Sequence, residues 1–323
     1  YGWAGDWDIW FDTWGKQFEK ETGIKLRYVS GGGLEMYAKI ISEANAPKAD
    51  VFLSSAGYLY QLSNKNLLEP INWKQISNAV NVDSRFKDQD VAVFGYDIYQ
   101  IGYNTDFIKK QDVPKKWIDL ANPKFRGKII MRLPNSDLTA WIWFALKRSY
   151  GEEAAWKYLM DIYKNSSKWA GTPGDLVQGL ASGEAWAGGA SIGHVMLGRF
   201  QAGGPVASSV PEDGAIIMLN GLGIVKGAPH KAEAEKFIDF FLGKYVQNFI
   251  MNEKGTSLAV NRTVKLTNKN VEAVGLGGLD IDKVLERAFV PEWKYWTGLS
   301  EDGKRTRLEI LLNEIDLRVK GMK

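Results

Sequence analysis

The sequence predicts an α/β protein made of two doubly wound lobes that are joined by two crossover strands. Its 323 residues suffice for about two domains of ordinary size. Segments of strand character alternate with segments of helical spacing along most of the chain, which is the order that parallel sheets require. Two β-rich stretches, residues 91–104 and 215–227, are longer than an average strand. At both stretches we expect the chain to cross from one lobe to the other.

The first part of the chain reads as a βαβαβ half. Residues 7–20 carry apolar side chains at helical spacing, and residues 24–30 alternate as a strand does. A second helix is expected within residues 31–44, a segment that opens with three glycines. Residues 49–55 form the short apolar run of a buried parallel strand, and a helix follows at 57–70. This order is the repeating unit of a doubly wound sheet.

The second lobe is expected to continue the alternation with elements of its own. Its strands are expected at 128–132, 166–172, 185–190 and 205–211, and its helices at 138–150, 152–163, 173–184 and 191–204. An amphipathic helix at 230–243 and a charged helical tail at 281–323 complete the chain.

The two crossovers divide the chain into discontinuous lobes. The N-terminal lobe is expected to comprise residues 1–97 with 222–270, and the C-terminal lobe residues 98–221 with 271–323. A two-lobed body with paired crossover strands can hinge. The cleft between the lobes is therefore the expected ligand site.

Composition excludes several classes of function. Cysteine is absent, which excludes disulfides, thiolate metal sites and cysteine nucleophiles. The net charge of +3 comes from interspersed acids and bases without a basic stripe, so no nucleic-acid partner is expected. No apolar run is long enough to span a membrane. The abrupt start on an apparent strand end leads us to expect that an export signal or lipid-anchor segment has been removed.

Several strings of the sequence resemble one family when taken in order. They are FEKETGIKLRYVSGGG (18–33), YNTDFIKK (103–110), VPKKWIDLANPKFRGKIIMRLP (113–134), GLASGEAWAGGA (179–190) and VPEDGAIIMLNGLGIVKGAPHKAEAEKFIDFFLG (210–243). The chain thereby resembles the extracellular solute-binding proteins of the ferric-binding, sugar-phosphate and polyamine group.

The resemblance implies the type II periplasmic binding protein fold and closure of the lobes on a small-molecule solute. It also implies delivery of that solute to a membrane ABC permease. By the same resemblance we expect a monomer without a cofactor in the periplasm or outside the cell, either free or lipid-anchored.

In the first lobe, the candidate ligand contacts lie where strands give way to helices. Free N–H groups at a helix N-terminus attract anionic oxygens, and glycine lets a ligand approach the backbone. Each candidate also has a structural interpretation, because serines cap helices and a surface tryptophan packs. The candidates are Trp3, Asp6, Ser30, Gly31, Gly32, Gly33, Ser54 and Ser55.

In the second lobe, three segments lie at expected strand ends: 134–141, 169–173 and 188–194. The resemblance places 188–194 where relatives contact their ligand. Helix capping competes at the hydroxyl positions, and a lone histidine is often structural. The candidates are Ser136, Thr139, Trp169, Thr172, Gly189, Ala190, Ser191 and His194.

The glycine-rich helix starts favour an anionic organic solute, such as a phosphate ester or phosphonate. Ferric relatives carry adjacent tyrosines in the segment that here reads GGASIGHVML, and its lack of tyrosine counts against iron. A cation binder, either polyamine-like or ferric, stays open as the alternative, with Asp6, Asp137 and Asp213 as the acids that would have to converge.

An enzyme on the same scaffold is the remaining alternative. Neither G-x-S-x-G nor H-E-x-x-H occurs, and a multi-histidine centre is excluded by the presence of only His194 and His230. We therefore expect no catalytic residue and no resident metal.

Overall fold

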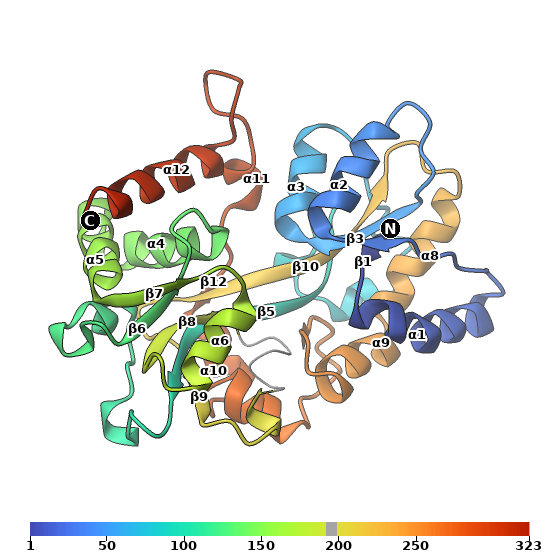
Figure 1. Ribbon diagram of the computed structural model, residues 1–323. Helices are drawn as coiled ribbons and strands as arrows, with labels where there is room; N and C mark the ends of the chain where they lie inside the picture. The colour runs from blue at the N-terminus through green and yellow to red at the C-terminus, as the bar shows by residue number, and fades with distance from the viewer. Residues whose placement is uncertain (192–198, 323) are drawn as a thin grey trace. The chain divides into compact units, whose positions relative to one another are not determined.

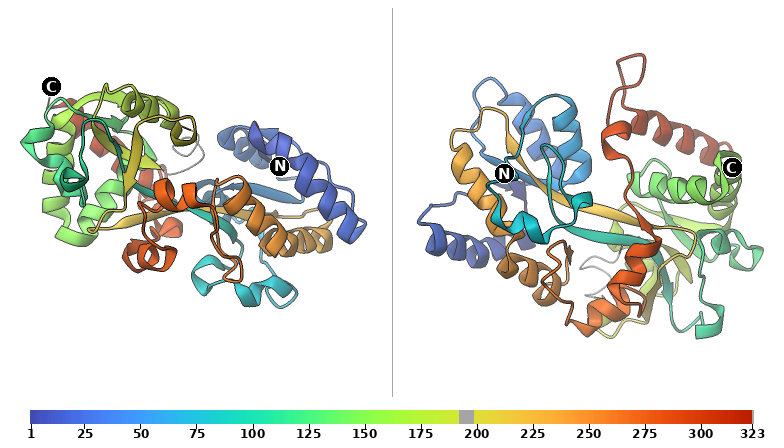
Figure 2. Two further views of the ribbon diagram at one scale, coloured as in Figure 1. Left: turned by 90° about the horizontal axis from the view of Figure 1, so that it is seen from below. Right: turned by 180° about the vertical axis from the view of Figure 1, so that it is seen from behind.

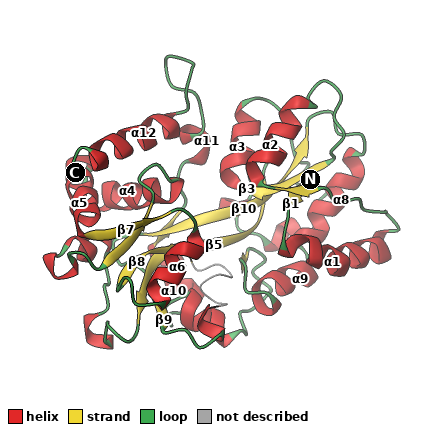
Figure 3. Ribbon diagram, in the orientation of Figure 1, coloured by secondary structure: helices red, strands yellow, loops and turns green. Residues whose placement is uncertain are grey.

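A computed structural model describes the backbone of residues 1–191 and 199–322 (Figure 1). The chain forms two compact units. Unit 1 comprises residues 1–96, 219–265 and 293–298, and unit 2 comprises residues 97–218, 266–292 and 299–323. Helices and strands alternate in both units (Figure 3).

Unit 1 is built from short strands and the helices between them. Its helices are α1 (Asp6–Thr22), α2 (Gly33–Ser42), α3 (Ala56–Asn64), α8 (Lys231–Leu242), α9 (Lys244–Asn248) and α11 (Trp293–Trp296). Its strands are β1 (Gly2–Trp3), β2 (Ser30–Gly31), β3 (Val51–Ser55), β4 (Leu68–Glu69) and β11 (Leu258–Ala259).

Unit 2 has a longer sheet. Its helices are α4 (Asp137–Tyr150), α5 (Glu152–Asn165), α6 (Pro173–Ala181), α10 (Ile281–Arg287) and α12 (Arg307–Lys320). Its strands are β6 (Ile129–Arg132), β7 (Ser166–Ala170), β8 (Ala187–Ser191), β9 (Val206–Ser209) and β12 (Ala288–Phe289). Strand β6 pairs in parallel with β7 and with β8, so the carboxyl ends of these three strands share one edge of the sheet.

Two long strands pass from one unit into the other. Strand β5 (Ala92–Asn104) pairs with β11 at Tyr96 and with β8 at Tyr99. Strand β10 (Ala215–Val225) pairs with β12 through its first residues and with β3 through Asn220 to Ile224. These are the two stretches at which the sequence predicted crossovers.

The core of unit 1 is aromatic. Helix α1 buries Trp10, Trp14 and Phe18, which are spaced four residues apart and therefore share one face. The Trp14 and Phe18 rings meet Phe241 and Phe237 of α8 at centroid distances of 5.1 Å and 5.4 Å. Helices α1 and α8 accordingly lie side by side in every view (Figures 1 and 2).

Two segments differ from the sequence expectations. The expected strand at 24–30 is regular only at Ser30–Gly31. The tail was expected to belong wholly to the C-terminal lobe, yet Trp293–Gly298 packs with unit 1, because Asn64 Nδ2 donates to the Lys294 carbonyl and to Thr297 Oγ1. Within the described residues, no helix is long and apolar enough to cross a membrane.

Candidate functional site

The strand ends of unit 1 meet at one edge. Strands β1 and β2 are parallel, with Trp3 opposite Gly31. The Tyr1 amino group donates to the Val51 carbonyl (2.7 Å), and Leu53 N donates to the Tyr1 carbonyl (2.9 Å), which places β3 in parallel on the other side of β1. Helices α1, α2 and α3 begin directly after these strands. The candidate residues of the N-terminal lobe therefore share one strand-carboxyl edge, which we call half-site 1.

The glycine run at half-site 1 serves two purposes. A side chain at Gly33 would meet the Tyr58 ring at 2.9 Å, so packing favours glycine there. One at Gly31 would meet Met36 Cε at 2.6 Å, the end of a flexible side chain that can move away. Gly32 is different, since nothing lies within 4 Å of the position that a Cβ would take. Gly32 is also the N-cap of α2, so Ser30 does not cap this helix. Open space therefore faces the first turn of α2 at Gly32.

The two serines that end β3 are not used as helix caps. Ser55 occupies the N-cap position of α3, but its side chain makes no capping hydrogen bond. Ser54 is fully buried, and its hydroxyl has no hydrogen-bond partner among the described residues. A buried hydroxyl without a partner costs free energy unless something else satisfies it. The Ser54 hydroxyl is therefore a buried polar group at this edge that still lacks a partner.

Trp3 and Asp6 lie at the same edge in different surroundings. The Trp3 ring is half-buried and packs on Trp7 (5.3 Å between centroids) and Phe94 (6.5 Å). Asp6 is the exposed first residue of α1, and the capping carboxylate of this helix is that of Asp8, which accepts from Gly5 N at 2.9 Å. The Trp3 ring, which packs on Trp7 and Phe94, can offer one face to a ligand. The Asp6 side chain is exposed to solvent.

A second edge, half-site 2, is formed in unit 2 by the carboxyl ends of β6, β7 and β8. Its most informative residue is Arg132, the last residue of β6, which the sequence analysis did not select. Arg132 Nη1 donates to the Ala170 carbonyl (3.0 Å), whereas its buried Nε has no partner within the described parts of the chain. No carboxylate of the described residues lies within ion-pairing distance of this guanidinium. A basic residue closing an otherwise apolar strand was the signal in the sequence.

Tyr99 of β5 is the second residue that sequence reasoning missed. It is fully buried, and burial raises the pKa of its phenol. Its hydroxyl has no partner in the part of the chain that the structure describes. A cavity of about 10 Å³ lies between Tyr99, Arg132, Leu138 and Gly189, which is room for roughly one water molecule. Two unpaired donors, the Tyr99 hydroxyl and Arg132 Nε, thus come from residues that line the same small cavity.

Two of the hydroxyl candidates in unit 2 are structural. Thr139 is fully buried and donates to the Leu133 carbonyl (3.0 Å) while it shares a hydrogen bond with the Tyr163 hydroxyl (2.8 Å). Thr172 caps α6, since its Oγ1 accepts from Asp175 N at 3.1 Å. The expectation that these hydroxyls face a ligand is therefore not met; they hold the strand end and the helix start that frame half-site 2.

The other candidates of unit 2 remain near the edge. Ser136 is the N-cap of α4 without a capping hydrogen bond, and its hydroxyl lies 3.4 Å from Asp137 Oδ1. The half-buried Trp169 ring packs on Tyr163 at 5.9 Å. Gly189 is required by packing, because a Cβ there would lie 2.6 Å from the Tyr99 hydroxyl. Ala190 and Ser191 end β8, and only their backbone is described. His194 lies outside the described residues.

Asp213, an acid that a cation site would need, is buried away from both half-sites. Only 7% of it is exposed, and its carboxylate accepts from Trp117 N (2.8 Å) and from the Tyr150 hydroxyl (3.2 Å). Residues 212 and 213 form a turn, but the Asp213 carboxylate points inward and anchors the segment that begins at Trp117. Burial raises the pKa of Asp213 despite these hydrogen bonds.

This raised pKa predicts a pH dependence of stability. Just above the usual aspartate pKa of 3.8, the unfolded chain has lost the proton that the native carboxyl still holds. The free energy of unfolding therefore falls as the pH rises through this window. We expect Asp213→Asn to flatten that fall above about pH 4 in denaturant titrations. If the free energy of unfolding depends on pH equally in the variant and the parent protein, the pKa of Asp213 is not raised.

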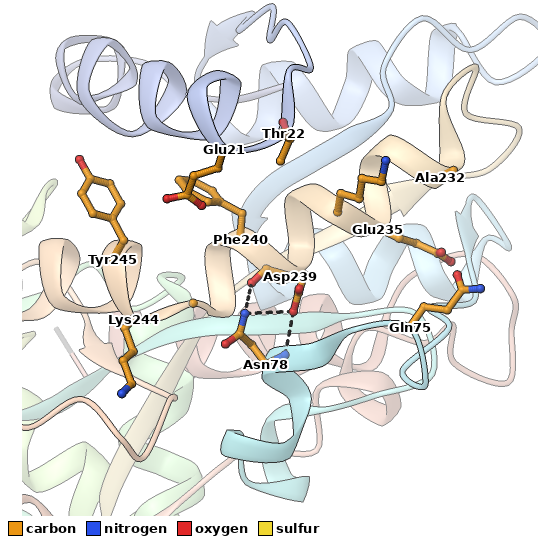
Figure 4. Close-up of a pocket in the computed structure, with 12 residues that line it drawn as sticks. Glu21, Thr22, Gln75, Asn78, Ala232, Glu235, Asp239, Phe240, Lys244 and Tyr245 are labelled. Atoms are coloured by element: carbon orange, nitrogen blue, oxygen red, sulfur yellow. Dashed lines mark hydrogen bonds between the residues drawn. The ribbon is translucent and has the colours of Figure 1, made fainter.

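The pocket of about 610 Å³ shown in Figure 4 is not the candidate site. It lies along α8 and the last turn of α1, and no residue from the strand ends of half-site 1 lines it. Its central carboxylate, that of Asp239, is occupied by Ser77 Oγ (2.7 Å) and Asn78 N (2.8 Å). Acidic and basic side chains both line the remainder, so the pocket offers no distinct charge to a ligand.

Comparisons with known proteins agree with this geometry. Residues 46–274 match the family described as bacterial extracellular solute-binding protein. A periplasmic protein of Salmonella typhi, provisionally named for binding 2-aminoethylphosphonate, is 24% identical over 271 residues, covering 82% of this chain and 78% of the relative. The Fe(3+)-binding periplasmic protein of Serratia marcescens is 24% identical over 289 residues, covering 84% and 81%.

The solved structures support the fold. The periplasmic binding protein AfuA from Actinobacillus pleuropneumoniae, with fructose 6-phosphate bound, matches with a TM-score of 0.73 at 24% identity, covering 99% of this chain and 97% of that one. This likeness confirms the predicted fold class, the two-lobed α/β fold of type II periplasmic binding proteins. The family is one of solute-binding proteins, whose members serve ABC importers in the periplasm or outside the cell. The chain belongs to the bacterial extracellular solute-binding protein family, as the solute-binding component of an ABC importer.

Proposed function

We propose that the solute is a small organic anion, with a phosphate ester or phosphonate favoured. Half-sites 1 and 2 hold the same solute molecule, the lobes close on it, and the loaded protein delivers it to the membrane permease. The protein acts as a monomer and catalyses no reaction. The observation that carries the proposal is Arg132, a guanidinium at a strand-carboxyl edge with a buried, unpaired Nε and no carboxylate partner among the described residues.

The chemistry of Arg132 favours an anion over a cation. A guanidinium presents several N–H donors in a planar fork that matches the oxygens of phosphate and carboxylate groups. A cation placed beside it would be repelled. At half-site 1 the buried Ser54 hydroxyl adds a neutral donor, which suits an oxyanion. The Gly32 N–H at the start of α2 already donates to the Glu35 carboxylate (3.2 Å), so a solute oxygen there would have to use the other N–H groups of the first turn. Two relatives whose names or titles mention a phosphonate and a sugar phosphate support this solute class.

Gly32→Ala tests the contribution of half-site 1. Gly32 has φ −65° and ψ 148°, which any residue adopts, and nothing lies near the new methyl group. We therefore expect an unchanged melting temperature and, because the methyl group enters the space before α2, at least tenfold weaker solute binding by calorimetry. Gly33→Ala is the contrasting variant, since it must displace the Tyr58 ring and should lower the melting temperature as well. Full affinity in Gly32→Ala would remove this turn from the site.

A thermal-shift screen tests the solute class. The solutes are 2-aminoethylphosphonate, fructose 6-phosphate, spermidine and ferric citrate, each added to the purified protein. A ligand at 100 times its Kd stabilises by about 2.7 kcal/mol, a readable shift. A shift with the phosphonate or sugar phosphate supports the proposal. A shift only with spermidine or iron would overturn the anionic class and favour the cation alternative.

Two further measurements address the monomer and the absence of catalysis. Light scattering of the protein with and without the bound solute should give the mass of one chain, 36.2 kDa. Prolonged incubation followed by mass spectrometry of the solute should recover it unchanged. Turnover of the solute would instead support the alternative of an enzyme on this scaffold.

A further inference from the structure

The hydroxyl of Tyr99 faces a position that glycine leaves open. A Cβ at Gly189, on the neighbouring strand β8, would lie 2.6 Å from the Tyr99 hydroxyl oxygen. Two oxygen atoms joined by a hydrogen bond are about 2.5–3.0 Å apart, whereas packed atoms that share no hydrogen bond lie farther apart. The Tyr99 ring stacks on Trp117 at 5.6 Å between centroids, which restricts its movement. The space beside Gly189 therefore suits an atom that is hydrogen-bonded to this hydroxyl.

The side chains around this space offer two donors in apolar surroundings. Burial raises the pKa of Tyr99, so its phenol keeps the proton that it can donate. The guanidinium of Arg132 is always charged and accepts no hydrogen bond, so its Nε is a donor only. The remaining side chains that line the cavity are those of Leu138, Pro173, Leu176 and Val177.

A water molecule would be poorly satisfied between these donors. A buried water makes about three hydrogen bonds, and its two hydrogens need acceptors. Among the lining side chains the only acceptor is the Tyr99 oxygen itself. An oxygen of a phosphonate, phosphate or carboxylate group carries lone pairs and no hydrogen, so it can accept from both donors at once. The apolar lining strengthens both of these hydrogen bonds.

Arg132 links this cavity to the outer part of half-site 2. Its Nε is buried, while the residue as a whole is partly exposed. Nη1 donates to the Ala170 carbonyl at 3.0 Å, which leaves the edge of the guanidinium formed by Nε and Nη2 for a ligand. Carboxylate and phosphate groups bind such an edge with two oxygens. An anion that does so places one oxygen at Nε, where the Tyr99 hydroxyl can reach it.

We propose that Tyr99 contacts the solute directly: one terminal oxygen of the anionic group enters the cavity and accepts from the Tyr99 hydroxyl and Arg132 Nε together. This inference rests on the proposed anionic solute and adds a second residue that selects it. Because both protein groups donate, the cavity takes an oxygen without a hydrogen and disfavours a hydroxyl or an amide N–H. The anionic group must also present a second terminal oxygen to the outer part of Arg132.

Tyr99→Phe separates a solute contact from a packing role. The substitution keeps the ring and its stacking on Trp117 and removes a buried hydroxyl that has no partner among the described residues. The melting temperature without solute should therefore stay the same or rise. Calorimetry with 2-aminoethylphosphonate or fructose 6-phosphate, whichever binds the parent protein, should show binding that is about ten- to hundredfold weaker, because a hydrogen bond to a charged group is lost.

Two further tyrosines serve as controls. Tyr163 is also buried, but its hydroxyl donates to the Arg132 carbonyl (2.7 Å), so Tyr163→Phe should lower the melting temperature. Tyr103 lies at the other end of β5, opposite Ala187, and Tyr103→Phe should leave the affinity unchanged.

The outcomes for the solute class and for Tyr99 are distinguishable. If the parent protein binds one of the two anions and Tyr99→Phe binds it equally well, the contact is overturned while the anionic class stands. A lower melting temperature of Tyr99→Phe with unchanged affinity would assign Tyr99 to packing alone. If the parent protein binds neither anion, the anionic class and the Tyr99 contact are overturned together.

Discussion

Arg132→Gln should weaken the binding of a phosphonate or sugar phosphate by roughly two orders of magnitude. A hydrogen bond to a charged group contributes about 1.5–3 kcal/mol, and leaving the anion without its counter-charge raises the loss to about 2–5 kcal/mol. Calorimetry at fixed ionic strength measures the effect. The variant loses the hydrogen bond to the Ala170 carbonyl but also removes the buried Nε that has no partner, so the melting temperature without solute should change little.

The controls for this variant separate a contact from a general charge effect. Arg126→Gln removes the same charge from an exposed position of unit 2 and should leave the affinity within about twofold. Arg132→Lys keeps the charge but loses the planar fork, so an intermediate affinity is expected. If Arg132→Gln and Arg126→Gln bind the solute equally well, Arg132 is not in the site, and the anionic class loses its main support.

Gly188→Ala should destabilise unit 2 more than any other single methyl group considered above. Gly188 of β8 lies opposite Ile130 of β6, and a Cβ at Gly188 would lie 2.1 Å from the Ile130 carbonyl oxygen. That oxygen belongs to the backbone of β6, which is paired on both sides, and it cannot rotate away. Forcing the two strands apart should cost at least about 3 kcal/mol, the upper range for overpacking.

Circular dichroism during thermal unfolding measures this cost. A fall in melting temperature of at least about 6 °C is expected for a unit of this size. Gly174→Ala is the matched control, because its methyl group would meet only Thr172 Oγ1, at an ordinary 3.6 Å. Unchanged melting of Gly188→Ala would show that β6 and β8 do not approach as closely as described.

The architecture was readable from the sequence because it depends on patterns that many residues share. The length of their β-rich stretches predicted the two crossover strands. The spacing of apolar residues predicted α4, α5 and α6, and Pro173 marked the first turn of α6. Residues 24–30 alternate as a strand does, but only Ser30–Gly31 pairs with another strand. Alternation of side chains does not tell whether a partner strand lies beside the segment.

The site was only partly readable, for reasons that are also physical. A hydroxyl side chain at a strand end can cap a helix, bond to the backbone or contact a ligand. The sequence does not distinguish Thr139, which donates to the Leu133 carbonyl directly after β6, from Ser54, whose hydroxyl has no partner among the described residues. Tyr99 was hidden in the middle of a crossover strand that carries several aromatic residues. Its relation to Arg132 depends on the pairing of β5 with β8, a contact between residues distant in sequence.

Three buried polar groups lower the stability of the protein when no solute is bound. They are the Ser54 hydroxyl, the Tyr99 phenol and Arg132 Nε. Each group was stripped of water during folding without gaining a partner among the described residues, so each one weakens the empty state. Selection for a robust empty protein alone would replace them with alanine, phenylalanine and methionine. In the proposed site the solute supplies the missing partners, so we expect the empty protein to be the less stable of the two forms.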